Sequence, residues 1–112
     1  MITRPTAYFH LHLVSDATGE TLNAIAKAVT VQFATVSPIE HVYPLVRTTR
    51  ELTRVLKSIE DEPGIVLFTL VDDDLRQQLE EACRSIGSPA IAVLDPVHAA
   101  LRSYLGAEST PR

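Results

Sequence analysis

The feature that most constrains the fold of this chain is a pattern that occurs four times in succession along its 112 residues. A short run of branched and aromatic residues ends in polar turn residues, and a segment of helical period follows. The apolar runs are residues 8–14, 39–46, 65–71 and 90–94, and the helical segments are residues 18–33, 49–59, 75–86 and 97–105. Strands that alternate with helices of this length run parallel, with right-handed crossovers. The pattern therefore predicts an α/β fold.

Two of the runs indicate the order of the strands. Pro44 cannot donate a hydrogen bond to a strand ladder, so the second run belongs at an edge of the sheet. The third run is apolar except for Thr69, which is typical of a central strand covered on both faces. The simplest arrangement is a three-layer, Rossmann-like domain, in which a four-stranded parallel sheet of order 2-1-3-4 carries helices on both faces.

The helical segments carry apolar residues on one face. In the first segment these are Leu22, Ile25, Ala26, Val29 and Phe33, and in the last they are Val97, Leu101, Tyr104 and Leu105. Asp73 or Asp74 is the expected cap of the third helix, and Gly87 its end. The neighbours of Cys83 at helical spacing are apolar, so we expect a buried and inert thiol.

Composition limits the number of domains and the class of partner. With 46% hydrophobic and 21% charged residues, the chain suits one globular domain, residues 8–106, between a flexible segment 1–7 and a tail 107–112. The formal charge of −4 and the lack of a Lys/Arg cluster argue against nucleic-acid binding. The apolar runs are short and none resembles a signal peptide, so we expect no membrane association and a cytoplasmic location, or an organellar one after loss of a transit peptide.

The most informative stretch is the turn after the first predicted strand. It places three hydroxyls, two carboxylates and a glycine at a helix entrance, in the order Ser15, Asp16, Ala17, Thr18, Gly19, Glu20, Thr21. Backbone amides and the positive end of the helix dipole favour a phosphate there. Spacing alone favours the alternative that Ser15, Asp16 or Thr18 simply caps the helix. The turn lacks the glycines of a dinucleotide site, and the chain contains no P-loop.

The predicted strand order places other candidates beside this turn. Open sheets of this kind bind ligands beyond the carboxyl ends of the strands, here between the first and third strands, which brings Asp72–Asp74 to the turn. Arg47 and Arg50 should lie on its other side, where they could grip a phosphate or be solvated helix-start residues. The acids beside Asp16 could hold magnesium, or only stabilise a helix dipole.

The string Ser-Asp-x-Thr-Gly-Glu-Thr at residues 15–21, directly after an apolar strand, resembles the opening of the proteins that regulate pyruvate, phosphate dikinase and phosphoenolpyruvate synthase. The resemblance continues through residues 41–48, 63–71 and 93–96, and so covers essentially the whole chain. It implies a bifunctional enzyme. One activity is a Ser/Thr kinase that uses ADP to phosphorylate a threonine beside the target's catalytic histidine. The other uses inorganic phosphate to remove that group and releases pyrophosphate.

The resemblance also implies what this chain lacks. The family's P-loop-like motif for ADP and phosphate lies in a carboxy-terminal half that is absent here, so no cofactor is expected in this chain. We therefore expect a docking or architectural domain, inactive alone, with the candidate substrate- or phosphate-binding residues Ser15, Asp16, Thr18, Gly19, Glu20, Thr21 and Arg47. Its expected partner is pyruvate, phosphate dikinase or phosphoenolpyruvate synthase.

Two other functions stay open. Acids after the first and third strands resemble a phosphoreceiver or small-anion module, although the fifth strand and the lysine of receiver domains are missing. The second open function is dimerisation. The sheet edge at residues 90–94 is apolar and carries no residue that blocks pairing, so a homodimer is possible.

His10 and His12 alternate along the first predicted strand and share one face, as a His-x-His metal pair would. No cysteine or third histidine is expected nearby, so we expect covered, hydrogen-bonded histidines and no metal site. His41, on an edge strand, and His98, on the last helix, are weaker candidates.

Overall fold

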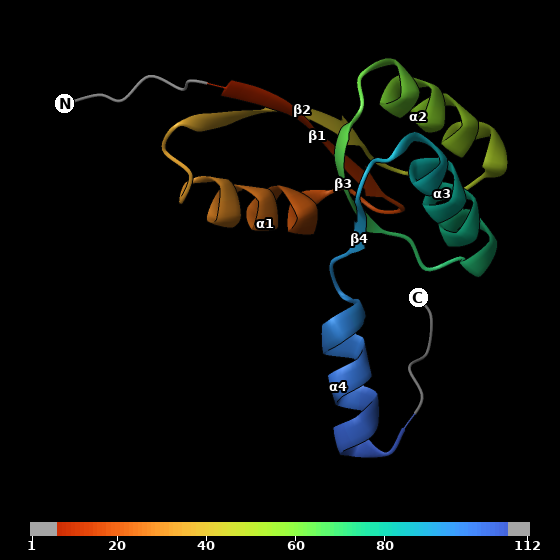
Figure 1. Cartoon of the computed structure of the whole chain (residues 1–112). Helices are drawn as coiled ribbons and strands as arrows, with labels where there is room; N and C mark the ends of the chain where they lie inside the picture. Colours follow the sequence, from red (N-terminus) through yellow and green to blue (C-terminus); the bar gives the residue numbers. More distant parts are fainter. Residues whose placement is uncertain (1–6, 108–112) are drawn as a thin grey trace.

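The computed structural model describes residues 7–107, in which strands and helices alternate. Their bounds are β1 (Ala7–Ser15), α1 (Glu20–Thr30), β2 (Val36–Tyr43), α2 (Thr49–Asp61), β3 (Gly64–Thr69), α3 (Asp73–Ile86), β4 (Ala90–Ala92) and α4 (Asp95–Leu105). All neighbouring strands are parallel, in the order β2-β1-β3-β4. Helix α1 lies on one face of the sheet, and α2 and α3 lie side by side on the other (Figure 1). The predicted three-layer α/β fold and strand order are confirmed.

Two apolar clusters join the three layers. Leu11 and Leu13 of β1 pack with Leu22 and Ala26 of α1 on one face. The larger cluster lies on the other face, where Val14 of β1 and the buried residues of β3 pack against α2 and α3. Side chains alternate along a strand, so β1 supplies residues to both clusters. Cys83 is buried in the larger cluster, as expected, and burial raises the pKa of its thiol.

Strand β2 is at the edge, as predicted, but it occupies different residues. The expected run was 39–46, whereas the strand begins at Val36, contains Pro38 and ends before Pro44. After the strand, the amides of Leu45 and Val46 still bond across to the β1–α1 turn, with Leu45 in a left-handed conformation (φ 59°). Pro44 thus marks the end of the edge strand and is not part of it.

Two helix boundaries correct the expectations. Helix α1 ends at Thr30, so Phe33 lies beyond it, and both Val29 and Phe33 are exposed. The cap of α3 is Asp72, whose Oδ1 accepts a hydrogen bond of 3.0 Å from the N–H of Leu75. Asp73 and Asp74 lie in the first turn instead. Gly87 ends α3 in the left-handed conformation that its position predicted.

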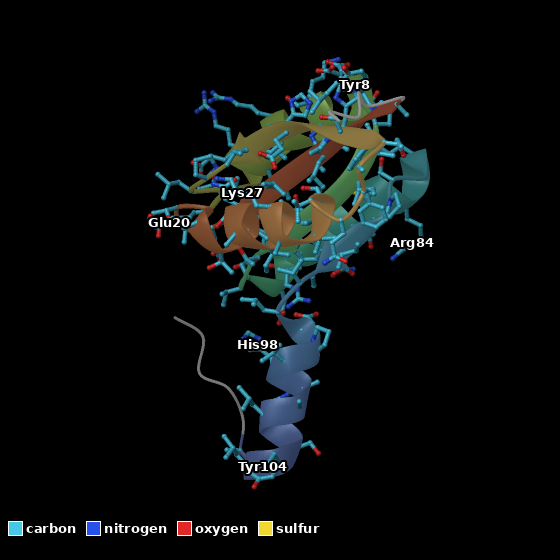
Figure 2. All side chains as sticks on the ribbon, turned by 90° about the vertical axis from the view of Figure 1, so that its left-hand side faces the viewer. Tyr8, Glu20, Lys27, Arg84, His98 and Tyr104 are labelled. Carbon is cyan, nitrogen blue, oxygen red and sulfur yellow. The ribbon has the colours of Figure 1, made fainter. Side chains whose placement is uncertain are left out.

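Helix α4 does not join either layer. It stands away from the sheet, as Figures 1 and 2 show, and none of its residues is buried. Its apolar residues Val97, Leu101, Tyr104 and Leu105 are all exposed. An ion pair between Arg76 of α3 and Asp95 ties its first turn to the body of the domain. The two faces of the sheet are therefore covered by α1 on one side and by α2 and α3 on the other, and α4 covers neither.

The expected flexible segment, residues 1–7, and tail, residues 107–112, lie outside the described residues except at Ala7, which begins β1, and Ala107. Within residues 7–107, no helix has both the length and the apolar character that a membrane crossing requires.

Candidate functional site

The site is built around the turn that leads from β1 to α1. Ser15 ends β1 and is buried. Its Oγ accepts a hydrogen bond of 3.0 Å from the N–H of Ala17 and another of 3.3 Å from the hydroxyl of Thr69. The hydroxyl of Ser15 thus links the turn to the end of β3 through these two hydrogen bonds.

Asp16 joins this turn to the one that follows β3. Its N–H donates to the carbonyl oxygen of Thr69 at 3.1 Å, and its Oδ2 accepts from the N–H of Val71 at 2.8 Å. Asp16 therefore fixes the relative position of two loops that are far apart in the sequence.

Gly19 is the residue at which the chain enters α1. Its φ of 88° is left-handed, and no side chain caps the helix. The favoured interpretation of Ser15, Asp16 or Thr18 as the cap of this helix is therefore wrong. The first amides of a helix have no partner within it, so α1 presents N–H groups and the positive end of its dipole beside the turn.

The remaining candidates of the turn face solvent. Thr18, Glu20 and Thr21 are exposed, and their side chains make no hydrogen bond within the described part of the chain. Figure 2 shows Glu20 at the outer end of α1. These three side chains are free to meet a ligand or a partner protein.

Arg47 reaches the turn from the loop after β2. Its Nε donates a hydrogen bond of 2.9 Å to the carbonyl oxygen of Asp16, and its side chain is otherwise exposed. The terminal nitrogens of the guanidinium make no hydrogen bond within residues 7–107, so they are available to an oxyanion.

The helix that follows Arg47 is capped reciprocally. The Oγ1 of Thr48 accepts from the N–H of Glu51 at 3.1 Å, and the Glu51 carboxylate accepts from the Thr48 hydroxyl and the Arg47 N–H. The hydrogen bond from Thr48 is the main reason that the pKa of Glu51 is lowered. This capping box fixes the backbone of Arg47. Arg50 is exposed and does not line the groove described next.

A groove of about 620 Å³ lies where these loops meet. It is lined by residues that follow β1, β2 and β3: Asp16, Ala17, Val46, Arg47, Val71, Asp72 and Leu75. It opens beyond the carboxyl ends of the strands, at the switch between β1 and β3. One guanidinium, two carboxylates and an apolar floor suit a polar ligand that carries both an anionic group and hydrogen-bond donors.

The acids at this edge are engaged with the backbone. Asp16 and Asp72 each use a carboxylate oxygen to accept a backbone N–H. Within residues 7–107, they do not gather with Asp73 and Asp74 into a group that could hold an ion.

The structure brings together other residues that the sequence did not. His10 and His12 share one face, as expected, but the expectation of no third histidine nearby is wrong. His41 of β2 lies beside both, with ring centroids 5.1 Å from His10 and 4.7 Å from His12. The register of β2 against β1 places His41 opposite His12 in the ladder. Alternating His-x-His in one strand and a histidine in its neighbour was the only signal.

Comparison with known proteins shows the family of this chain. The sequence profile of a family described as kinase/pyrophosphorylase matches residues 11–112. The chain belongs to this family. It is 55% identical over 106 residues to a protein of Rhodopseudomonas palustris (strain BisB5), a match that covers 95% of this chain and 38% of that protein. That relative is named as a candidate pyruvate, phosphate dikinase regulatory protein.

Other relatives of the kinase/pyrophosphorylase family carry the same name. A protein of Bradyrhizobium diazoefficiens is 55% identical over 94% of this chain, and one of Caulobacter vibrioides is 55% identical over 97%. The chain spans 38% and 35% of their lengths. The resemblance read from the Ser15–Thr21 string is thus confirmed at the level of the family.

Proposed function

We propose that this chain is the substrate- and partner-docking domain of a regulator of pyruvate, phosphate dikinase or phosphoenolpyruvate synthase that acts in the cytoplasm. The whole regulator would phosphorylate a threonine of its target with ADP, and remove the phosphate with inorganic phosphate to give pyrophosphate. The observation that carries the proposal is the groove at the strand ends, where Asp16, on the family's characteristic turn, meets Arg47 from the loop after β2.

The groove and the turn beside it each have a role in this proposal. The guanidinium of Arg47 and the free amides of α1 attract the phosphate of the modified threonine or of inorganic phosphate. Asp16 holds the two loops at a fixed spacing through Val71. Thr18, Glu20 and Thr21, which are exposed but do not line the groove, would contact the target protein.

The division of labour follows from the sequence. The chain contains no Gly-x-x-x-x-Gly-Lys-Ser/Thr segment, so it supplies no P-loop for ADP. Alone, it should transfer no phosphate to purified dikinase in the presence of ADP. ADP-dependent labelling of the dikinase by this chain would contradict the proposed role.

The decisive experiment uses a full-length relative, such as the protein of Caulobacter vibrioides, with alanine at the positions that align with Asp16 and Thr18. Both the forward and the reverse reactions should fall at least tenfold, while circular dichroism stays unchanged. An alanine at the position that aligns with Glu60, which lies on α2 away from the groove, is the control. Wild-type rates for both reactions in the Asp16 and Thr18 variants would refute the proposal.

A stand-alone anion or phosphoreceiver-like module is the second candidate, and Arg47 in the groove favours it. Labelling of Asp16 or Asp72 by acetyl phosphate, lost on substitution to Asn, would support it. Dimerisation is the third, favoured by the exposed apolar residues of α4. Sedimentation at several concentrations distinguishes it, because a monomer at all concentrations excludes a homodimer.

A further inference from the structure

Three histidines and one glutamate gather on the sheet face that α2 covers, away from the groove. His10 and His12 come from β1 and His41 from β2, and Glu62 is the C-cap that directly follows α2. His10 precedes Ser15 by five positions, which is about 16 Å along a strand. This histidine cluster is thus a separate feature, and no role for it follows from the proposed function.

His12 has both of its ring nitrogens in hydrogen bonds. It is fully buried, and its Nε2 donates a hydrogen bond of 2.7 Å to the carbonyl oxygen of Glu62. Because Nε2 carries the proton, Nδ1 of the neutral ring accepts, and the Tyr43 hydroxyl donates to it at 2.9 Å. Burial lowers the pKa of His12, which favours this neutral form. Both nitrogens are used, so His12 positions Glu62 and is not itself a ligand.

The other three side chains converge. Nδ1 of His10 lies 2.9 Å from Nε2 of His41, and Nε2 of His10 lies 3.3 Å from Oε2 of Glu62. One ligand atom from each residue lies within 4.8 Å of the others. Ligands of a tetrahedral zinc ion, with bonds of about 2.0–2.2 Å, lie about 3.3–3.5 Å apart. His10 meets His41 and Glu62 through different ring nitrogens, so side chains must reorient to bring one His10 nitrogen to a shared ion.

The surroundings suit an exchangeable ion. Two imidazoles and one carboxylate are ligands that zinc and similar divalent ions prefer. The side chains of His10 and Glu62 are 26% and 52% exposed, so an ion can enter and water can take a fourth position. The neighbouring strand lies close to His10: β3 begins at Gly64, where a Cβ would sit 2.0 Å from the carbonyl oxygen of His10.

We propose that His10, His41 and Glu62 form a binding site for a divalent transition-metal ion of the zinc class. Three protein ligands leave one position open, which is typical of a catalytic or exchangeable site and not of a closed structural one. The site is independent of the groove at the strand ends.

The test is calorimetric titration of the 112-residue chain, purified without a histidine tag, with zinc chloride at pH 7.5. We expect one ion per chain with a Kd tighter than about 100 μM. Cobalt(II) should give the visible absorption of a tetrahedral site. Glu62→Gln and His41→Gln should each weaken zinc binding at least tenfold, whereas His98→Gln, on the exposed α4 helix labelled in Figure 2, should not change it.

Circular dichroism shows whether each variant folds. The Glu62 side chain is half exposed, so Glu62→Gln decides the outcome if His41→Gln does not fold. A wild-type Kd weaker than about 100 μM would overturn the proposal. So would unchanged affinity in the folded Glu62→Gln variant, or an equal loss on His98→Gln, which would identify surface binding.

Discussion

The carboxylate of Asp16 accepts a hydrogen bond of 2.8 Å from the backbone N–H of Val71, 55 residues away in the sequence. This bond ties the turn after β1 to the loop after β3. Both loops line the groove, so its width depends on this contact. A side chain at the most characteristic turn of the sequence thus sets the shape of the candidate site.

Asp16→Ala should lower the free energy of unfolding by about 1 kcal/mol, because the N–H of Val71 loses its acceptor at a partly exposed position. Asp16→Asn keeps an acceptor oxygen and should cost less. Asp73→Ala, in the first turn of α3 without such a bond, should stay within about 0.5 kcal/mol of wild type. Urea unfolding followed by circular dichroism measures all three. Equal stability of Asp16→Ala and wild type would contradict this account.

Gly64→Ala should be the most damaging glycine substitution. Its Cβ would lie 2.0 Å from the carbonyl oxygen of His10 in the neighbouring strand, so β1 and β3 would be forced apart. We expect Gly64→Ala to lower the free energy of unfolding by about 3 kcal/mol or more, or to prevent folding.

Gly87→Ala is the matched comparison for Gly64→Ala. A Cβ at Gly87 meets nothing within 4 Å, and only its φ of 74° is unfavourable. The expected loss is about 1–2 kcal/mol. Thermal unfolding of both variants should therefore show the larger fall in Tm for Gly64→Ala; the reverse order would be inconsistent with the close approach of the two strands.

The capping box at the start of α2 should make stability depend on pH. The folded-state pKa of Glu51 is lowered, so its contribution is present above the ordinary value of 4.5 and is lost as pH falls through the folded value. Glu51→Gln should lower Tm at pH 7 and have little effect near pH 3. Glu60→Gln, on the same helix, is the control. If Glu51→Gln lowers Tm by the same amount at both pH values, the charge of the Glu51 carboxylate is not the cause of the loss.

Helix α4 should contribute little to the stability of the domain. Leu101→Gln should change the free energy of unfolding by no more than about 0.5 kcal/mol, because Leu101 is exposed. Leu79→Ala, which removes a fully buried side chain from α3, should cost about 2–5 kcal/mol. Chemical unfolding of the two variants compares them. A large loss on Leu101→Gln would mean that α4 packs against the domain in solution.

The architecture was available from the sequence. Hydrophobic period distinguishes strand from helix over a few residues, and short helical crossovers force parallel strands. An apolar third run marked the centre of the sheet, and Pro44, expected within the second run, marked its edge, although the strand ends just before it. These are local or topological properties, so no knowledge of packing was needed to predict the order β2-β1-β3-β4.

The contacts that give the sites their chemistry were decided only by the tertiary structure. The left-handed backbone of Gly19 decided how α1 begins. The position of Val71 decided which group the Asp16 carboxylate accepts a hydrogen bond from. The register of β2 put His41 opposite His12, 29 places along the chain, and the end of α2 brought Glu62 to them. Such pairs depend on strand register and loop paths, and a shift of one residue turns a side chain to the other face. Local patterns do not contain that information.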